Sequence, residues 1–154
     1  MLRDMALEVN SSQLQNLMSS VAGDIEILKD TVIKNLAFIG ETAVKRARDV
    51  GNYEDRTGNL RSSIGYLLVY NGRTIYEGGQ KAVSGTIGNG TDGVATSQSL
   101  LNRIKGELPS DRVVLVVTAG MSYAWYVENV HHRDVLASAE LEADRLVKKL
   151  FEID

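Results

Sequence analysis

Glu128 and His131 have the residue types and spacing that could support metal chemistry. They are three residues apart, as in the carboxylate–imidazole pairs that bind a metal from one helix. Such a site needs further ligands from another element. His132, the only other histidine, is adjacent to His131 and points about 100° away from it on a helix. These features favour a surface or turn role over a metal site.

Ser122 is the candidate nucleophile of the chain. It lies in the segment GMSYA, which is close to the nucleophile-elbow string of hydrolases but lacks the second flanking glycine. A catalytic serine also needs a histidine and an orienting acid, and His131 and His132 are too close in sequence and lack that acid. We therefore expect no catalytic residue and no metal. A small hydrolase that uses Ser122, or a metal at Glu128 and His131, is the enzymatic alternative.

Gly88, Gly90 and Gly93 match the dinucleotide-binding fingerprint as a string. That fingerprint requires a buried strand before the loop and a helix that opens at its end, so that the pyrophosphate meets the helix N-terminus. Residues 81–87 do not have the pattern of a buried strand, and the loop has no P-loop lysine. We therefore expect solvated loop structure here and no cofactor.

The composition is typical of a single globular domain over residues 1–154. The chain is 44% hydrophobic and 24% charged, close to the average for globular proteins. Its net charge of −3 and pI of about 5.4 leave no basic excess of the kind that nucleic-acid-binding proteins carry. Cysteine is absent, which excludes disulfides and fits a reducing compartment. We expect no membrane span and no secretory signal.

The first third of the chain has the apolar period of a helix. A helical extension is predicted over residues 1–23, capped by Ser11 or Ser12, and a long helix over residues 24–50, because Gly23 weakens a helix. The apolar residues that give this pattern follow one another in steps of three and four: Leu14, Met18, Val21, Ile25, Leu28, Val32, Leu36, Ile39, Ala43, Ala47 and Val50.

Three strands are predicted downstream. Residues 64–70 are apolar at both odd and even positions, which predicts a strand covered on both faces, or covered on one and used as an interface on the other. Asn71 and Gly72 predict a type I′ hairpin that leads into a return strand over residues 73–77. The β-branched run over residues 112–118 predicts a central strand.

Glycine and helical spacing define the remaining segments. Residues 78–96 hold six of the fourteen glycines and are predicted to form a long flexible loop. Helices are predicted over residues 97–108 and 122–130, and Asp134 is predicted to cap a last helix. This order predicts an α+β fold with a long N-terminal helix, a small antiparallel sheet and a C-terminal helix packed on the sheet.

Aromatic residues are concentrated directly after the third predicted strand. Tyr123, Trp125 and Tyr126 are three of only nine aromatic residues in the chain. Because aromatic side chains dominate core and interface energetics, this segment is interpreted as a hinge point or a contact surface. Arginines that flank the first turn allow either a solvated, acid-paired face or a subunit contact, since arginine is enriched at interface hot spots: Arg46, Arg48, Arg56 and Arg61.

Two segments together resemble a known family. DRTGNLRSSI, residues 55–64, resembles the "(D)-T-G-x-L-R-x-S-I" element of bacteriophage tail-completion proteins, the head–tail joining or neck proteins of long-tailed double-stranded DNA phages. YAWYVE, residues 123–128, resembles the "Y-A-x-Y-V-E" element of the same family. The order of elements also fits over residues 24–151. The chain departs from the family in residues 131–143, where HHRDVLASAELEA replaces a proline-containing stretch.

The resemblance implies a structural virion protein that is present in the host cytoplasm during assembly. It implies a ring of six copies between the head connector, or a head-closure protein, and the tail tube or tail terminator protein. DNA would pass the lumen without sequence-specific binding, and no catalysis or cofactor is implied. A head-closure protein, a tail terminator and a host protein domesticated from a prophage are the alternatives.

The resemblance also implies which residues make contacts. Glu128 is given a structural role within this element. The residues expected at contacts with other subunits or partners are Arg56, Asn59, Arg61, Tyr123, Trp125, Tyr126 and Glu128. The loop over residues 78–96 is expected to be mobile in the free subunit and ordered by docking on the tail or connector. Its expected docking residues are Gly79, Lys81, Gly88, Asn89 and Asp92.

Overall fold

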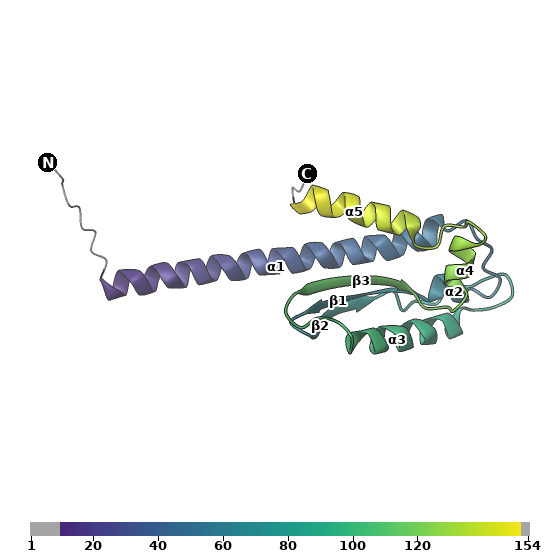
Figure 1. Ribbon diagram of the computed structural model, residues 1–154, viewed down its shortest axis with the longest axis horizontal. Helices are drawn as coiled ribbons and strands as arrows, with labels where there is room; N and C mark the ends of the chain where they lie inside the picture. The colour runs from purple at the N-terminus through teal and green to yellow at the C-terminus, as the bar shows by residue number, and fades with distance from the viewer. Residues whose placement is uncertain (1–9, 152–154) are drawn as a thin grey trace. The chain divides into compact units, whose positions relative to one another are not determined.

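The computed structural model describes residues 10–151 and confirms the α+β fold (Figure 1). The chain divides into two compact units, residues 1–34 and 35–154. Residues 1–9 of the expected N-terminal extension lie outside the described residues. The elements, in chain order, are α1 (Ser11–Val50), α2 (Asn59–Ser62), β1 (Ile64–Tyr70), β2 (Arg73–Gly78), α3 (Thr91–Lys105), β3 (Val113–Ala119), α4 (Ala124–Asn129) and α5 (Ala137–Phe151).

α1 is one continuous helix, so the predicted break at Gly23 and Asp24 is wrong. A continuous helix keeps its backbone hydrogen bonds through this point, which outweighs the cost of about 1 kcal/mol for a glycine inside a helix. Apart from the adjacent residues and the backbone of the helix itself, no described atom lies within 4 Å of where a side chain at Gly23 would begin. The glycine is therefore tolerated at this point and does not end the helix.

The start of α1 is a capping box formed by Asn10 and Gln13. The Asn10 Oδ1 atom accepts a hydrogen bond from the Gln13 backbone N–H (2.8 Å), and the Gln13 Oε1 atom accepts one from the Asn10 N–H (3.2 Å). The N-cap is Asn10 and not the expected Ser11 or Ser12. Asparagine and serine cap helices about equally well, and the reciprocal bond from Gln13 selects the residue three positions before it.

The sheet has three antiparallel strands in the order β2-β1-β3. β1 is central and buried in all but its last residue, as predicted for a strand covered on both faces. Asn71 and Gly72 both have positive φ values, 50° and 74°, as the predicted type I′ turn requires. β3 is a half-buried edge strand, so its prediction as a central strand is wrong. A β-branched run indicates a strand, but pairing with other strands decides its place in the sheet.

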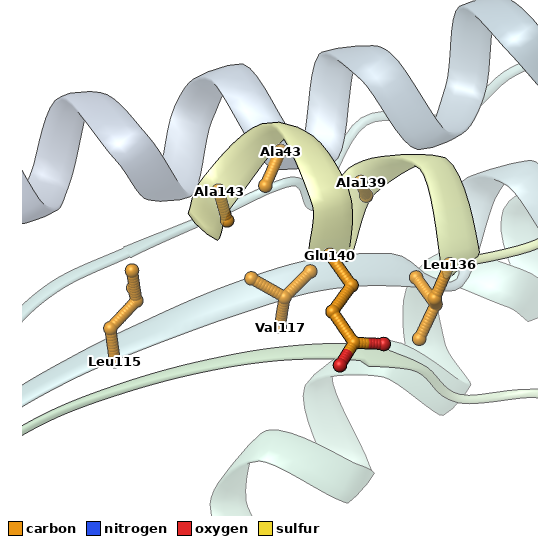
Figure 2. Close-up of a pocket in the computed structure, with 7 residues that line it drawn as sticks. All are labelled: Ala43, Leu115, Val117, Leu136, Ala139, Glu140 and Ala143. Carbon is orange, nitrogen blue, oxygen red and sulfur yellow. The ribbon is translucent and has the colours of Figure 1, made fainter. Parts of the chain in front are cut away.

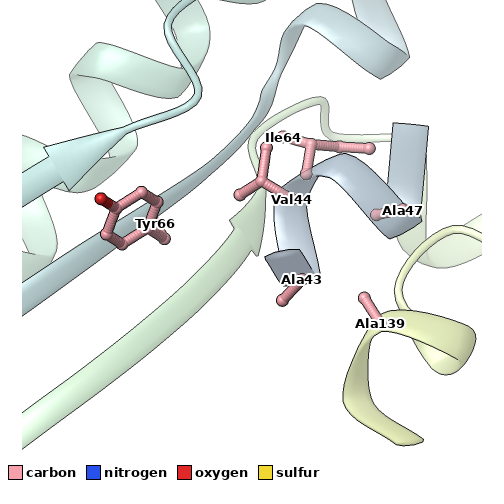
Figure 3. Close-up of a cluster of buried hydrophobic side chains, with 6 residues drawn as sticks. All are labelled: Ala43, Val44, Ala47, Ile64, Tyr66 and Ala139. Carbon is pink, nitrogen blue, oxygen red and sulfur yellow. The ribbon is translucent and has the colours of Figure 1, made fainter. Parts of the chain in front are cut away.

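The two faces of β1 are covered by different helices (Figure 1). Ile64 and Tyr66 belong to a cluster on one face with residues of α1 and α5 (Figure 3). Leu67 and Val69 pack on the opposite face against Leu101 of α3. Alternating side chains of a strand point to opposite faces, which explains why both the odd and the even positions of this strand are apolar.

Small residues let α1 and α5 approach the sheet and each other closely. Ala43 and Ala47 of α1 and Ala139 of α5 are buried in the cluster shown in Figure 3. A Cβ atom at Gly40 would come within 2.5 Å of the Tyr66 ring, so glycine makes room for this tyrosine. Burial, and then a hydrogen bond from the hydroxyl to Glu41 (2.8 Å), raises the pKa of Tyr66 above its ordinary value.

Two helices differ from the prediction. α3 begins at Thr91 and not at Ser97, so the loop before it is shorter than the predicted 78–96. α2 is a single turn that was predicted as loop. Glycine content misled the first prediction, and α2 is too short to show an apolar period. No helix within residues 10–151 is both long enough and apolar enough to cross a membrane.

Candidate interaction surface

Three aromatic side chains on α4 and directly before it are exposed, and together they are called the aromatic platform: Tyr123, Trp125 and Tyr126. Trp125 is 69% exposed, Tyr126 50% and Tyr123 39%. The side chain of Val130, just after the helix, is also exposed. Large apolar side chains grouped on a surface mark sites that bind other molecules, whereas single exposed ones need no explanation. The aromatic segment is thus largely a surface and only partly a core element.

α4 is fixed from below by its small and aliphatic residues. Ala124 is buried in a cluster with Tyr53, Leu60 and Val135, and the half-buried Val127 packs against the same cluster. A platform held in this way loses little conformational freedom when a partner binds it, which lowers the entropic cost of association.

Glu128 joins α4 to the start of α5. Its Oε1 atom accepts hydrogen bonds from the backbone N–H groups of Val135 (3.3 Å), Leu136 (2.9 Å) and Ala137 (2.8 Å). The first N–H groups of a helix have no partner within the helix, and a carboxylate also complements the positive end of the helix dipole. Glu128 therefore caps α5 from outside, in line with the structural role expected for it.

Asp134 also contributes to the start of α5, as predicted. Its Oδ1 atom accepts from the Ser138 N–H (3.0 Å), and the Ser138 hydroxyl donates to its other carboxylate oxygen. The backbone N–H of Asp134 donates to the Asn52 side chain (2.7 Å). The helix start is therefore tied both to α4 and to the segment that follows α1.

The candidate catalytic residues face different partners. The His131 ring lies edge-on against Tyr126, with 4.9 Å between ring centroids, while Glu128 is bonded to the backbone of α5. Ser122 is exposed in the turn before α4. Within residues 10–151 no group of three or more His, Asp or Glu side chains is arranged to hold a metal ion. The absence of catalysis stays a prediction.

The segment over residues 55–63 forms a rigid turn around α2. Both carboxylate oxygens of Asp55 accept from backbone N–H groups, Oδ2 from Arg61 (2.8 Å) and Oδ1 from Leu60 (3.4 Å). Gly58 precedes α2 with φ 78°, a conformation that L side chains rarely adopt. A side chain there would also overlap the Val83 carbonyl oxygen. The aspartate and the glycine of this motif are therefore needed for the turn itself.

Arg48 and Arg61 form a reciprocal pair, the arginine brace. The Arg48 Nε atom donates to the Arg61 carbonyl (3.1 Å), and the Arg61 Nε atom donates to the Arg48 carbonyl (3.2 Å). Arg48 also donates to the carbonyls of Ile64 (2.9 Å) and Gly79. Burial lowers the pKa of Arg48 below its ordinary value, with smaller opposing contributions from neighbouring acids, of which Glu41 is the largest.

Arg61 additionally holds the chain that leaves α1. Its Nη2 atom donates to the carbonyls of Gly51 (2.8 Å) and Tyr53 (3.3 Å), and its guanidinium lies over the Tyr53 ring, 4.5 Å from the centroid. Burial raises the pKa of the Tyr53 hydroxyl to about 12, against an opposing effect of the Arg61 charge. Arg61 is thus used inside the subunit, where its planar fork matches several carbonyls at once.

The glycine-rich loop packs backbone to backbone against this turn. Ile87 N–H donates to the Arg56 carbonyl (2.8 Å), and Gly90 N–H donates to the Thr57 carbonyl (3.0 Å). The Asn59 side chain accepts from Gly93 N–H (3.1 Å), and a Cβ atom at Gly93 would overlap the Asn59 backbone. Glycine here permits close approach of two segments, which is a use of glycine distinct from flexibility. Mobility of the loop in solution stays a prediction.

The expected docking residues of this loop have mixed exposure. Lys81, Asn89 and Asp92 are exposed, whereas Gly79 and Gly88 are half-buried. The Asn89 Oδ1 atom accepts from the Thr91 N–H (3.2 Å) and hydroxyl (2.8 Å), which shapes the entry into α3. The polar residues are therefore available to a partner, and the glycines serve the fold.

The structure brings the two family-like segments together at one end of the unit over residues 35–154 (Figure 1). Leu60 of the first and Ala124 of the second are in the same buried cluster. Burial, followed by the charge of Asp55, raises the pKa of the Tyr123 hydroxyl, while Thr57 acts in the opposite direction. The side chains of both segments therefore influence each other directly.

The expected contact residues fall into two groups. Arg56, like the aromatic platform, is exposed, while Asn59, Arg61 and Glu128 make the internal hydrogen bonds described above. Sequence reasoning did not assign a structural role to Tyr53 or distinguish Arg48 from Arg46. An aromatic residue close to a buried arginine pair has no short-range sequence signature. The only sequence feature that indicated Tyr53 and Arg48 was their position near the end of a predicted helix.

An apolar groove lies between α1, β3 and α5 (Figure 2). Its volume is about 280 Å³. Three alanines in its wall are too small to fill the space between the helices and the strand. Its lining residues are Ala43, Leu115, Val117, Leu136, Ala139, Glu140 and Ala143. The groove has the character of a gap in packing, with a single carboxylate from Glu140 among its lining side chains.

Comparison of the chain with protein-family models, with curated proteins and with solved structures finds no match.

Proposed function

We propose that the protein is a non-enzymatic structural protein of the phage neck, which completes the tail end and joins the tail to the head connector. The observation that carries this proposal is the aromatic platform on α4. Trp125, 69% exposed, stands on a helix whose opposite side is buried and whose end is bonded to α5. Such a surface is suited to binding another protein.

The energetics of the platform favour a protein partner. Tryptophan, tyrosine and arginine are the residues that carry most of the binding energy in protein interfaces. Trp125 and Tyr126 are next to each other, and the exposed Arg56 belongs to the turn whose Asp55 influences the pKa of Tyr123. Tyrosine and tryptophan also combine a large apolar area with a hydrogen-bonding group, which suits a surface that is wet before assembly and dry after it.

The choice of a neck protein among structural proteins rests on the resemblance of the two segments. The segment over residues 55–64 forms the turn beside the platform, and the segment over 123–128 forms the platform itself. The proposed partners are further copies of the chain in a ring of six, the head connector or head-closure protein, and the tail tube or tail terminator. DNA would pass the lumen of this ring without sequence-specific contacts. A head-closure or tail-terminator role differs only in which of these proteins is bound.

Binding to isolated virion parts tests this proposal. Tail tubes and head connectors, purified separately from the phage whose genome carries the gene, are each mixed with the full chain and sedimented. We expect co-sedimentation with at least one of them and loss of more than about tenfold in affinity for Trp125→Ala, the usual size of a hot-spot effect. Tyr126→Ala is compared with the matched control Tyr76→Ala, which removes a similarly exposed tyrosine from β2.

Two results would contradict the proposal. One is a virion that lacks the polypeptide at the portal–tail junction, as judged by mass spectrometry and electron microscopy. The other is equal binding by the Tyr126→Ala and Tyr76→Ala variants, which would remove the role of the platform. Hydrolysis of ester or phosphoester substrates that is lost in Ser122→Ala would favour the enzymatic alternative.

A further inference from the structure

The first half of α1 carries a regular apolar stripe, which we call the seam. Its residues follow one another in steps of four, three, four, three and four. An average step of 3.5 residues is the repeat of a left-handed coiled coil and differs from the 3.6 of a straight helix. The seam residues are Leu14, Met18, Val21, Ile25, Leu28 and Val32. They span 19 residues, just under three heptads.

The seam is exposed within the described residues. Its first five side chains are between 48% and 64% exposed, and Val32 is half-buried. Most of the stability of a helix in a protein comes from packing of its apolar face, and this face is uncovered among the described residues. A long helix with a row of large, uncovered aliphatic side chains is therefore an element that needs a partner.

We infer that the seam binds the seam of a second copy of this chain, as a parallel and in-register coiled coil. Assigning Met18, Ile25 and Val32 to the first core position of the heptad places Leu14, Val21 and Leu28 at the second. β-Branched residues at the first position with leucine at the second favour a two-stranded parallel coil. The pattern of Ile25, Val32, Leu14 and Leu28 follows this preference.

Charge complementarity selects a second copy in parallel orientation. In this register Asp24 and Lys29 are at the two positions that flank the core, five residues apart. In a parallel, in-register pair, these are the positions that face each other across the interface, so each Asp24 meets the Lys29 of the other copy. An antiparallel pair would place like flanking positions together. Within its own helix, the Lys29 Nζ atom lies 3.6 Å from a Glu26 carboxylate oxygen.

The one glycine of this segment fits the same register. Gly23 is at the heptad position opposite the core, and no described atom outside the adjacent residues and the backbone of the helix lies within 4 Å of its potential side chain. The glycine therefore lowers the stability of the helix at a position that does not contact the partner. Asn35, at the next second core position, interrupts the heptad pattern with a polar residue at the start of the unit over residues 35–154. This inference does not rest on the proposed neck function.

Analytical ultracentrifugation of the full chain over a concentration series tests the inference. We expect the mass of two chains at high concentration. Ile25→Asp places a charge in the seam and is expected to weaken association by about 100-fold or more. Ile27→Asp is the matched control, because Ile27 is 68% exposed against 56% for Ile25 but lies on the other side of the helix. It is expected to leave association unchanged.

Orientation is tested by two further variants. Because the chain has no cysteine, Leu14→Cys introduces a single thiol. Under oxidation it is expected to cross-link two chains, which an antiparallel pair would hold too far apart for a disulfide. Asp24→Lys is expected to weaken association by about three- to tenfold, and the double change Asp24→Lys with Lys29→Asp to restore it.

Three results would overturn the inference. They are a single-chain mass at every concentration, equal association of the Ile25→Asp and Ile27→Asp variants, or no cross-link at position 14 in a chain that does associate. None of these would bear on binding of the aromatic platform to virion parts, so failure of this inference and failure of the neck proposal are distinguishable.

Discussion

The two ends of α1 share one apolar period but present it in opposite ways. Leu14 and Leu28, near the start of the helix, are large and exposed, whereas Ala43 and Ala47, near its end, are small and buried. Ile39 and Val44, the two larger apolar residues of the buried stretch after residue 35, are 0% and 3% exposed. The same spacing of three and four residues therefore accompanies both an uncovered stripe and a packed core.

Side-chain size separates the two cases. Alanines and Gly40 let the end of α1 lie close to Tyr66 of β1 and to α5 (Figure 3). Large aliphatic residues instead suit knobs-into-holes contact between two helices of equal kind. Periodicity thus indicates that a helix has a contact face, and the volume of the side chains on that face indicates what it contacts.

Truncation of one isoleucine in each half of α1 gives the largest expected contrast. Ile39→Ala is expected to lower the free energy of unfolding of the unit over residues 35–154 by about 2–5 kcal/mol, because it leaves a cavity in a packed core. Ile25→Ala is expected to change it by less than about 0.5 kcal/mol. Urea denaturation at low protein concentration, followed by circular dichroism, measures both. Equal losses would show that the exposure of the first half does not describe the protein in solution.

Removal of Arg61 sharpens the comparison at the buried end. Arg61→Met keeps the length of the side chain but leaves the carbonyls of Arg48, Gly51 and Tyr53 without this donor. We expect the free energy of unfolding to fall by about 1.5–3 kcal/mol, the range for hydrogen bonds that involve a charged group. The control change Arg56→Met, at an exposed residue, is expected to alter the free energy of unfolding by less than about 0.5 kcal/mol. A similar loss in both variants would argue against the brace.

Alkaline pH is expected to loosen the same end. The pKa of Tyr53 is raised to about 12, so the folded state disfavours its ionised form. The associated stability, on the order of 2 kcal/mol, is fully present below pH 10 and is lost as the pH rises from about 10 to 12. Tyr53→Phe should remove this part of the pH dependence of stability. The part that comes from Tyr66, whose pKa is also raised, should remain.

The Tyr53→Phe variant has a second expected property. The Tyr53 hydroxyl is buried without a hydrogen-bond partner among the described residues, so its removal should not lower stability at neutral pH. Stability curves measured at pH 7 and pH 11 give both quantities. A clear loss at pH 7, or an unchanged slope at pH 11, would contradict this account of Tyr53.

The smallest effect is expected at the start of α1. Asn10→Ala removes the cap and is expected to cost about 1 kcal/mol of local helix stability. Ser12→Ala is the control, because the capping box uses Asn10 and Gln13 and not Ser12. Amide hydrogen exchange of the first helical turns is the measurement. Faster exchange in the Ser12→Ala variant than in the Asn10→Ala variant would instead support the helix cap that the sequence predicted at Ser11 or Ser12.

The fold class and the central hairpin were predictable because they depend on local signals. Apolar residues at both odd and even positions predicted β1, the pair Asn71-Gly72 predicted its turn, and helical spacing predicted α1, α4 and α5. The continuity of α1 through Gly23 and the edge position of β3 were not predictable. The first depends on cooperative backbone bonding that outweighs one weak residue, and the second on pairing between strands that are far apart in sequence.

The sequence predicted where the candidate site lies, but not which of its residues are exposed and which bind groups within the subunit. Aromatic content drew attention to α4, and the structure shows Trp125 at its surface. Arg61 and Glu128 have the same residue types as interface hot spots, yet their side chains bind backbone groups of their own subunit. A charged residue in a sequence does not indicate whether its partner is another chain or a distant carbonyl.

The contacts of Arg48 have a consequence for the order of folding. Its hydrogen bonds reach residues 13, 16 and 31 positions further along the chain. Hydrogen bonds between residues so far apart in sequence can form only once the intervening loops are closed, which costs conformational entropy. We therefore expect them to form after the hairpin and α1. Interactions that form after the transition state slow unfolding and leave the folding rate almost unchanged. The Arg48 guanidinium would therefore slow unfolding and lengthen the lifetime of the native state, with little effect on the rate of folding.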